Sequence, residues 1–168
     1  GSSAVLICRW ICCCSPRARR SNDGIAAATL CNALIGRVCG SMAEPAAHSL
    51  LTIARRDLKA ARALQDPCID ESNWGFQIQQ AVEKALKAWL YELGDSPPFT
   101  HDLVALFKRL LRAGADVDAH RDLAKFTDFA VQFRYDVDPE PMGLDRAHWL
   151  HRAEQLVDHV ASIIRAAD

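Results

Sequence analysis

The sequence predicts an all-α fold, a five-helix up-and-down antiparallel bundle over residues 42–168. From Met42 onward apolar residues recur at helical spacing, and no stretch shows the alternation of a half-buried strand. With 50% hydrophobic residues, the chain can fill the core of one domain. Short segments containing Pro or Gly separate the apolar stripes. Short connections make sequential helices neighbours, which favours antiparallel packing.

The first two helices are expected over residues 46–65 and 73–93. Asp66-Pro67 ends the first, because a proline disfavours helical conformation in the residue before it. Gly94 ends the second, since glycine readily takes the left-handed conformation that follows many helices. The stripes expected to face the core are Leu50, Ala54, Leu58 and Ala61 in the first helix and Ile78, Val82, Ala85 and Trp89 in the second.

Three further helices follow the Ser96-Pro97-Pro98 connector. Thr100 is expected to cap the third helix, with Asp102 in its first turn, and Gly114 to close it. Asp116 or Asp118 caps the fourth, and Asp145 opens the fifth. The expected core stripes are Leu103, Leu106, Leu110 and Leu111, then Ala119, Leu123, Phe126, Ala130 and Phe133, and last Trp149, Ala153, Leu156, Val160 and Ile163.

Residues 1–41 differ in composition from the rest and are interpreted as a poorly ordered extension, with Gly1-Ser2 as a cloning scar and Met42 as a natural start. Adjacent thiols at 12, 13 and 14 do not match the spacing of a disulfide framework or of a zinc site. The extension holds five of the arginines and one acid, so the net charge of −1 for the whole chain leaves about −5 on residues 42–168. That balance argues against a nucleic-acid groove built from bulk charge.

The apolar run from Ala4 to Cys14 is too short to span a bilayer and lacks a basic flank before it, so neither a membrane anchor nor a signal peptide is expected. Cys68 is the lone cysteine after Met42. A reducing cytoplasm is therefore the expected compartment.

Two strings in the second and third helices resemble the HEPN family: Gln79-Gln80-Ala81-Val82-Glu83-Lys84-Ala85-Leu86-Lys87-Ala88 and Thr100-His101-Asp102-Leu103. Arg56-Asp57-Leu58 before them and Arg134-Tyr135 after them follow the family's order, and the resemblance covers residues 46–166. It implies a helical bundle that often dimerises and is commonly encoded beside a minimal nucleotidyltransferase in toxin–antitoxin-like pairs.

Catalytic members of that family are metal-independent ribonucleases marked by an Arg followed, after four to six residues, by a His. Counting from Arg134, those positions hold Pro139, Glu140 and Pro141. Two other matches, Arg146 to His151 and Arg152 to His159, are expected by chance with this many arginines and histidines. The favoured function is therefore a nucleotide-binding or partner module. The alternative is a dimeric ribonuclease toxin in which Arg134 holds the phosphate and His148 or His151 moves the proton.

Gln80, Glu83, Lys84 and Lys87 are three or four residues apart and form one polar ribbon along the second helix. This ribbon could bind a phosphate or a partner chain. The simpler interpretation, which we favour, is a solvated face supported by the Glu83–Lys87 pair.

Arg134 and Tyr135 at the end of the fourth helix are candidates for binding a nucleotide such as ATP, because an arginine holds phosphate through a planar fork. They could equally cap that helix and pack on the bundle. His101 could act as an acid or base near neutral pH, although a structural role beside Asp102 is favoured.

No metal site is expected. His148 and His151 with Asp145 resemble an incidental surface group, and Asp136, Asp138 and Glu140 fail as a calcium loop because Pro141 stands where the turn glycine is required. The chain contains no P-loop, GxGxxG, HExxH or GxSxG string. A homodimer is expected, from the family and from apolar residues beside the core stripe: Trp74, Phe76, Leu90 and Tyr91.

Overall fold

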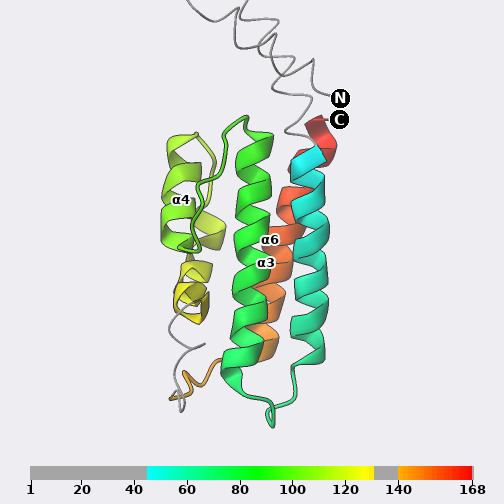
Figure 1. Cartoon of the computed structure of the whole chain (residues 1–168), viewed down its shortest axis with the longest axis vertical. Coiled ribbons are helices and arrows are strands. Elements are labelled where there is room, and N and C mark those ends of the chain that lie inside the picture. Colours follow the sequence, from blue (N-terminus) through cyan, green and yellow to red (C-terminus); the bar gives the residue numbers. More distant parts are fainter. Residues whose placement is uncertain (1–44, 131–139, 168) are drawn as a thin grey trace, which may run out of the picture. The chain divides into compact units, whose positions relative to one another are not determined.

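The computed structural model describes residues 45–130 and 140–167, and every regular element in them is helical. Five helices are present in these ranges: residues 45–63, α3 (Glu71–Glu92), α4 (Leu103–Arg112), η1 (Asp118–Ala130) and α6 (Arg146–Ala167) (Figure 1). The predicted all-α, five-helix bundle is confirmed. The extension predicted for residues 1–41 lies outside the described residues.

Helix α3 is the central element of the bundle. It packs against α6, η1 and α4, and Lys84 joins it to the helix at residues 45–63 by an ion pair with Asp57. Alanines at 81, 85 and 88 are fully buried, and their small side chains allow neighbouring helices to approach closely. The predicted stripe from Ile78 to Trp89 is buried, as expected, but burial extends to nearly every face of the helix.

Glycines end both α3 and α4 as predicted. Gly94 and Gly114 have φ values of 74° and 87°, a conformation that side chains disfavour. In each case the amide of the glycine and that of the next residue donate to carbonyls of the last turn, for example Asp95 N to Leu90 O at 2.9 Å. Both ends are therefore Schellman motifs.

The start of α4 differs from the prediction. Asp102, and not Thr100, is the N-cap: its carboxylate accepts from the amides of Val104 and Ala105 at 2.8 and 3.2 Å. The Thr100 hydroxyl instead accepts from the Asp102 amide. A carboxylate at this position also interacts favourably with the helix dipole, which explains why aspartate takes the role.

The connection between α3 and α4 departs from a strict up-and-down order. His101, just before α4, contacts Glu83 in the middle of α3, whereas Arg109 near the end of α4 binds Asp95 just after α3. The two helices therefore run in the same direction, and residues 93–102 return along them (Figure 1). The short-loop argument fails here because this proline-containing connector is long enough to run back beside α4.

The fourth helix is a 3-10 helix and not the expected α-helix. Its large buried side chains are His120, Leu123, Phe126 and Phe129, which recur at every third position, and the predicted Ala130 is buried as well. A helix with three residues per turn places such a series on one face. Ala119 is consequently exposed, against the prediction, Phe129 takes the core position instead, and Phe133 lies outside the described residues.

Other core assignments also need correction. Leu111 is exposed and Phe107 is buried in its place, while Leu51 is buried more deeply than Leu50. Trp74 and Leu90, which were expected to add apolar surface for a dimer, are completely buried within one chain. That part of the argument for self-association is therefore wrong.

Candidate functional site

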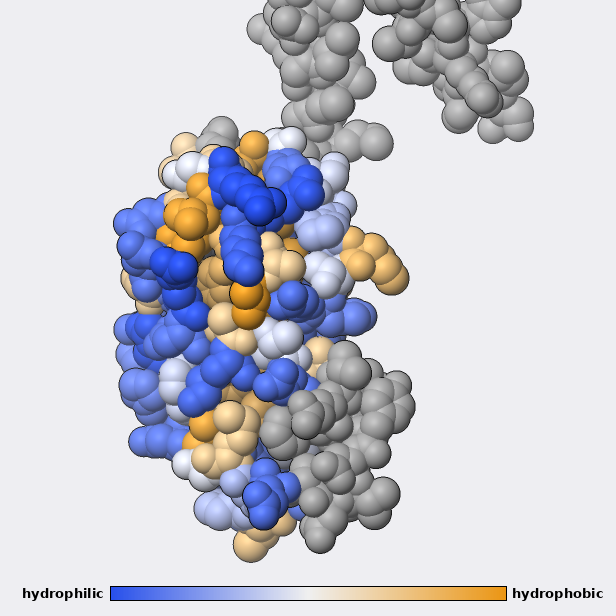
Figure 2. Space-filling view, turned by 90° about the vertical axis from the view of Figure 1, so that its left-hand side faces the viewer, coloured by the Kyte–Doolittle hydropathy of each residue, from blue (hydrophilic) through white to orange (hydrophobic). Residues whose placement is uncertain are grey.

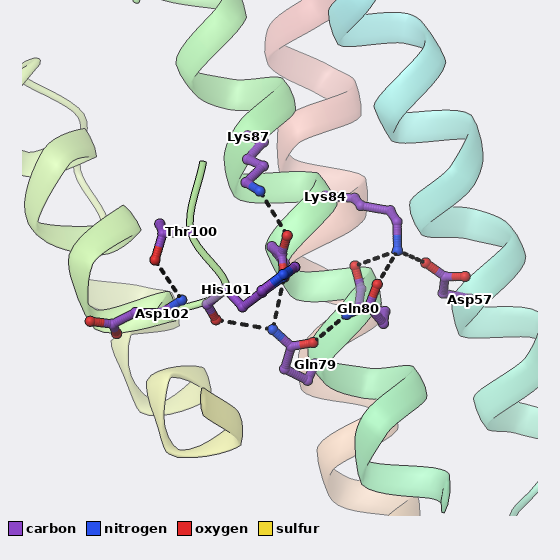
Figure 3. A network of polar contacts seen from close by, with 9 residues as sticks. Asp57, Gln79, Gln80, Lys84, Lys87, Thr100, His101 and Asp102 are labelled. Atoms are coloured by element: carbon purple, nitrogen blue, oxygen red, sulfur yellow. Dashed lines mark hydrogen bonds and ion pairs between the residues drawn. The ribbon is translucent and has the colours of Figure 1, made fainter. Parts of the chain in front are cut away.

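A connected cluster of polar side chains lies where the helix at residues 45–63, α3 and the connector before α4 meet (Figure 3). Six contacts of 2.7–3.1 Å link its members in one network of hydrogen bonds from the first helix to the connector. The members are Asp57, Gln79, Gln80, Glu83, Lys84, Lys87 and His101. We call this group the α3 polar cluster.

Glu83 is the centre of the cluster and is 5% exposed. One carboxylate oxygen accepts from Lys87 Nζ at 2.7 Å, and the other accepts from Gln79 Nε2 at 2.9 Å and contacts His101 Nδ1 at 3.0 Å. Burial by itself raises the pKa of Glu83, but the hydrogen bonds from these three donors outweigh it and the pKa is lowered. Glu83 is therefore an ionised, fully paired carboxylate at neutral pH.

Lys84 joins the cluster to the first helix. Its Nζ lies 2.7 Å from Asp57 Oδ2 and 2.8 Å from Gln80 Oε1. The Gln80 amide nitrogen donates in turn to Gln79 Oε1 at 2.7 Å. Because both lysines are held by carboxylates of the same chain, two cations balance two anions, and the cluster offers no surplus positive charge to a phosphate.

His101 holds the connector against α3. Its main-chain oxygen accepts from Gln79 Nε2 at 3.1 Å, and its Nδ1 lies 3.0 Å from Glu83 Oε2. An ionised carboxylate only accepts hydrogen bonds, so Nδ1 is the donor in this contact and Nε2 is not engaged by Glu83. The side chain is 59% exposed. His101 therefore combines a structural contact with a ring nitrogen that could accept a proton.

The structure brings together five of the predicted site residues: Gln80, Glu83, Lys84, Lys87 and His101. The solvated-face interpretation of the ribbon is wrong, because Glu83 is buried and the lysine side chains are only 20% and 16% exposed. The sequence reasoning missed Gln79 and Asp57 as members. Both residues belong to the sequence motifs on which the family resemblance rests, and this membership was the signal that could have identified them.

Arg134 and Tyr135 lie outside the described residues, so their roles stay predictions. His148 and His151 are exposed near the start of α6, where Asp145 caps the helix by accepting from the His148 amide. The His151 ring contacts the amide of Gln155, and the His148 ring packs edge-on against Trp149.

The arginines of α6 that precede histidines at family-like spacing already bind other groups. Arg146 donates to the main-chain oxygens of Leu64, Asp66 and Ile69 at 2.6–3.0 Å and fixes the loop after the first helix. Arg152 binds the carboxylate of Asp122 and the carbonyl of Ala119. Neither guanidinium is free to hold a phosphate without losing these bonds.

Residues 45–130 and 140–167 contain no cluster of three His, Cys, Asp or Glu side chains with the geometry to hold a metal ion. None of their helices combines the length and hydropathy that crossing a bilayer requires.

Comparison with known families identifies the fold. The sequence profile described as HEPN domain matches residues 47–167, which is well over half of the chain and covers the described helices except the first two residues of the helix at 45–63. The chain belongs to the HEPN domain family. No curated protein and no solved structure matched the sequence.

Within this HEPN domain, the α3 polar cluster contains most of the conspicuous motif residues. The string from Gln79 to Ala88 forms the middle of α3. In the Thr100-His101-Asp102 string, Asp102 caps α4 and His101 packs on α3. The residues that carried the resemblance thus stabilise the contact between α3, its connector and the first helix.

Proposed function

We propose that this HEPN protein is a binding module that acts with a minimal nucleotidyltransferase in a toxin–antitoxin-like pair. Metal-independent RNA cleavage needs a free cation for the phosphate and a base within hydrogen-bond reach. The observation that carries the proposal is that Arg146 and Arg152, the arginines before His151 and His159, are occupied by protein acceptors. The charge-balanced α3 polar cluster adds no free cation, and these features support binding over catalysis.

The proposed ligand is a nucleotide such as ATP, held through its phosphates by Arg134 and through a further contact to Tyr135. A charge-assisted bond to phosphate contributes about 1.5–3 kcal/mol. Arg134→Ala should therefore weaken ATP binding about tenfold or more in a calorimetric titration. Arg112→Ala is the matched control, because Arg112 is exposed and should leave the affinity unchanged. Equal affinity of the wild type and Arg134→Ala would remove Arg134 from the site.

The partner is tested by co-expressing the full chain with the neighbouring reading frame. The expected result is that this frame encodes a small nucleotidyltransferase and that the two chains elute together from size-exclusion chromatography. Separate elution of the two proteins, or a neighbour of another class, would contradict the proposed pair.

The alternative function, a metal-independent ribonuclease acting as a dimer, has one feature in its favour. His101 Nδ1 is held by the buried carboxylate of Glu83, which leaves Nε2 as a potential base on the partly exposed ring. Such support from a carboxylate also orients histidines in hydrolytic enzymes. The cation that would have to accompany this histidine is not supplied by Lys84 or Lys87, which are both paired.

A further inference from the structure

The connector between α3 and α4 presents a completely exposed phenylalanine. Phe99 is 103% exposed, whereas the other exposed large apolar residues of the described ranges reach 51% at most. The Thr100 amide donates to the Pro98 carbonyl at 2.9 Å, which closes an inverse γ-turn with Phe99 as its central residue. Two prolines, Pro97 and Pro98, restrict the backbone before this turn. The aromatic ring is therefore carried by a turn with little conformational freedom.

Both ends of the connector are fixed to the bundle. At one end, the Asp95 carboxylate accepts two hydrogen bonds of 2.6 Å from the Arg109 guanidinium. At the other end, the main-chain oxygen of His101 accepts from Gln79 and the ring contacts Glu83, so the α3 polar cluster holds the connector (Figure 3). Buried ionic groups add little stability over apolar residues of similar volume, but they can fix one arrangement of the segments that they join. Positioning the connector is therefore a role that the cluster can have beyond stability.

The surroundings of Phe99 combine an apolar anchor with a polar atom. The His101 ring lies beside the Phe99 ring, with 6.5 Å between the ring centroids, and it is partly exposed. Its Nε2 is not engaged by Glu83, so it is open to a hydrogen bond from or to a partner. Figure 2 shows that apolar residues on the face of α4 and η1 are scattered between hydrophilic ones. Binding on this side of the bundle therefore depends on local anchors.

We propose that Phe99 is the anchor of the interface with the nucleotidyltransferase partner, and that the α3 polar cluster and the Asp95–Arg109 pair position the connector that carries it. The inference rests on the proposed function, which supplies the partner. A ring that is already held in place loses little freedom on binding, so more of its buried apolar area contributes to affinity. Aromatic residues are also enriched among the few residues that dominate the energy of protein interfaces.

Charge favours a basic partner over a second copy as the occupant. Residues 42–168 carry a net charge of about −5, so two copies repel each other at long range, whereas a protein with a basic surface is attracted. The acids of the connector do not contribute a free charge, because Asp95 is paired with Arg109 and Asp102 caps α4. The partner surface that fits is therefore an apolar pocket for one aromatic ring on a protein with an excess of basic residues.

Isothermal titration calorimetry of the full chain with the protein encoded by the neighbouring reading frame tests the proposal. Phe99→Ala should weaken binding about 30-fold, an effect typical of removing one aromatic anchor. This variant should melt like the wild type, because the side chain of Phe99 is fully exposed. Phe99→Tyr keeps the ring and should bind nearly as tightly as the wild type. Met142→Ala, at an exposed apolar residue outside the connector, is the control and should leave the affinity unchanged.

Two further variants test the positioning of the connector. Gln79→Met removes the hydrogen bond to the main-chain oxygen of His101, and Arg109→Ala releases Asp95. Each should weaken binding roughly fivefold, because the connector must then be ordered when the partner binds. If both act through Phe99, neither should have a further effect in a Phe99→Ala chain. Equal losses in both backgrounds would overturn the positioning role.

The outcomes separate this inference from the proposed function. Unchanged affinity of Phe99→Ala for the neighbouring protein overturns the inference and leaves the partnership intact, whereas a wild type that does not bind this protein overturns both. An exposed aromatic ring can also stack on an unpaired base. A titration with single-stranded RNA decides this point. An affinity for RNA that falls in Phe99→Ala while the affinity for the neighbouring protein does not would overturn the inference and assign Phe99 to RNA.

Discussion

Helices α3 and α6 each carry a pair of polar residues one turn apart, yet the two pairs have opposite surroundings. On α3, Glu83 and Lys87 are one turn apart, largely buried and paired with each other, and Glu83 also contacts His101 of the connector. On α6, His148 and His151 are also one turn apart, but both are exposed. Spacing places side chains on one face, whereas the neighbouring elements decide whether that face is covered. Glu83 and Lys87 are therefore part of the packing, whereas His148 and His151 lie on the surface.

The largest effect that tests this comparison is expected for Glu83→Ala. Removing the carboxylate leaves the ammonium of Lys87 and the amide of Gln79 without their partner in a region with little solvent. Breaking a buried ion pair in this way costs about 3–5 kcal/mol. The free energy of unfolding, measured by urea denaturation followed by circular dichroism, should fall by an amount in that range.

The control is Glu154→Ala, which breaks the ion pair of Glu154 with the 69% exposed Arg62 on the outside of the bundle. Exposed pairs contribute less than about 1 kcal/mol. Similar losses for the two variants would mean that burial does not distinguish α3 from the surface.

The next effect concerns the tight contact of α3 with η1. A Cβ at Gly75 would overlap the ring of Phe129, which is completely buried. Gly75→Ala should therefore destabilise the domain by about 1–3 kcal/mol, although alanine favours a helix more than glycine does. Asn73→Ala, at an exposed position of the same helix, should be nearly neutral in the same urea titration. A stabilising effect of Gly75→Ala would mean that η1 does not pack this closely on α3.

Much of the fold was predictable because it depends on local pattern. The helical periods, the glycines at 94 and 114 and the order of family motifs all act within a few residues. The direction of α4 was not predictable in this way, because it depends on Asp95 and His101 finding partners on other helices. The 3-10 helix was missed because Leu123 and Phe126 are three residues apart, a spacing found in both α-helices and 3-10 helices. Only the burial of Phe129, three residues further on, distinguishes the two.

The residues of the candidate site were predictable from the sequence, but their burial and their partners were not. Gln80, Glu83, Lys84 and Lys87 were found from their spacing. Their burial requires the connector and the first helix to cover α3, and helical spacing does not report such long-range contacts. Asp57, the partner of Lys84, lies 27 residues away in sequence.

A smaller loss of stability is expected when the pH is lowered. Burial and the nearby His159 and Arg152 lower the pKa of His120 from its ordinary value of 6.5, so the folded state favours the neutral ring. The contribution of the neutral His120 ring to the free energy of unfolding is therefore fully present above pH 6.5. It is lost as the pH falls from 6.5 toward the lowered pKa of the folded state. The Glu83 pKa is lowered from 4.5, which adds a second loss as the pH falls below that value.

Urea titrations at a series of pH values would resolve the two steps. His120→Leu should remove the loss that begins near pH 6.5, and Glu83→Gln should remove the loss below pH 4.5. An unfolding free energy that does not change between pH 6.5 and pH 5 would contradict the assignment to His120, and one that does not change between pH 4.5 and pH 3 would contradict the assignment to Glu83.

The smallest effect is expected for the double variant His148→Ala and His151→Ala. Substitutions at exposed positions away from caps and networks change stability by less than about 0.5 kcal/mol. The Asp145 cap survives, because it accepts from the main-chain amide of residue 148 and not from the imidazole. A larger loss in thermal melts would show that these histidines belong to an interaction comparable with the α3 polar cluster.

The central claim, that this HEPN domain binds and does not cleave, is tested most directly by an RNA cleavage assay. Purified full chain is incubated with single-stranded RNA in the presence of a chelator and compared with Arg134→Ala, His101→Ala and the double variant of His148 and His151. The account predicts no cleavage above the buffer control for any of these proteins. Robust cleavage by the wild type that disappears in Arg134→Ala and in one of the histidine variants would contradict the account and establish the ribonuclease.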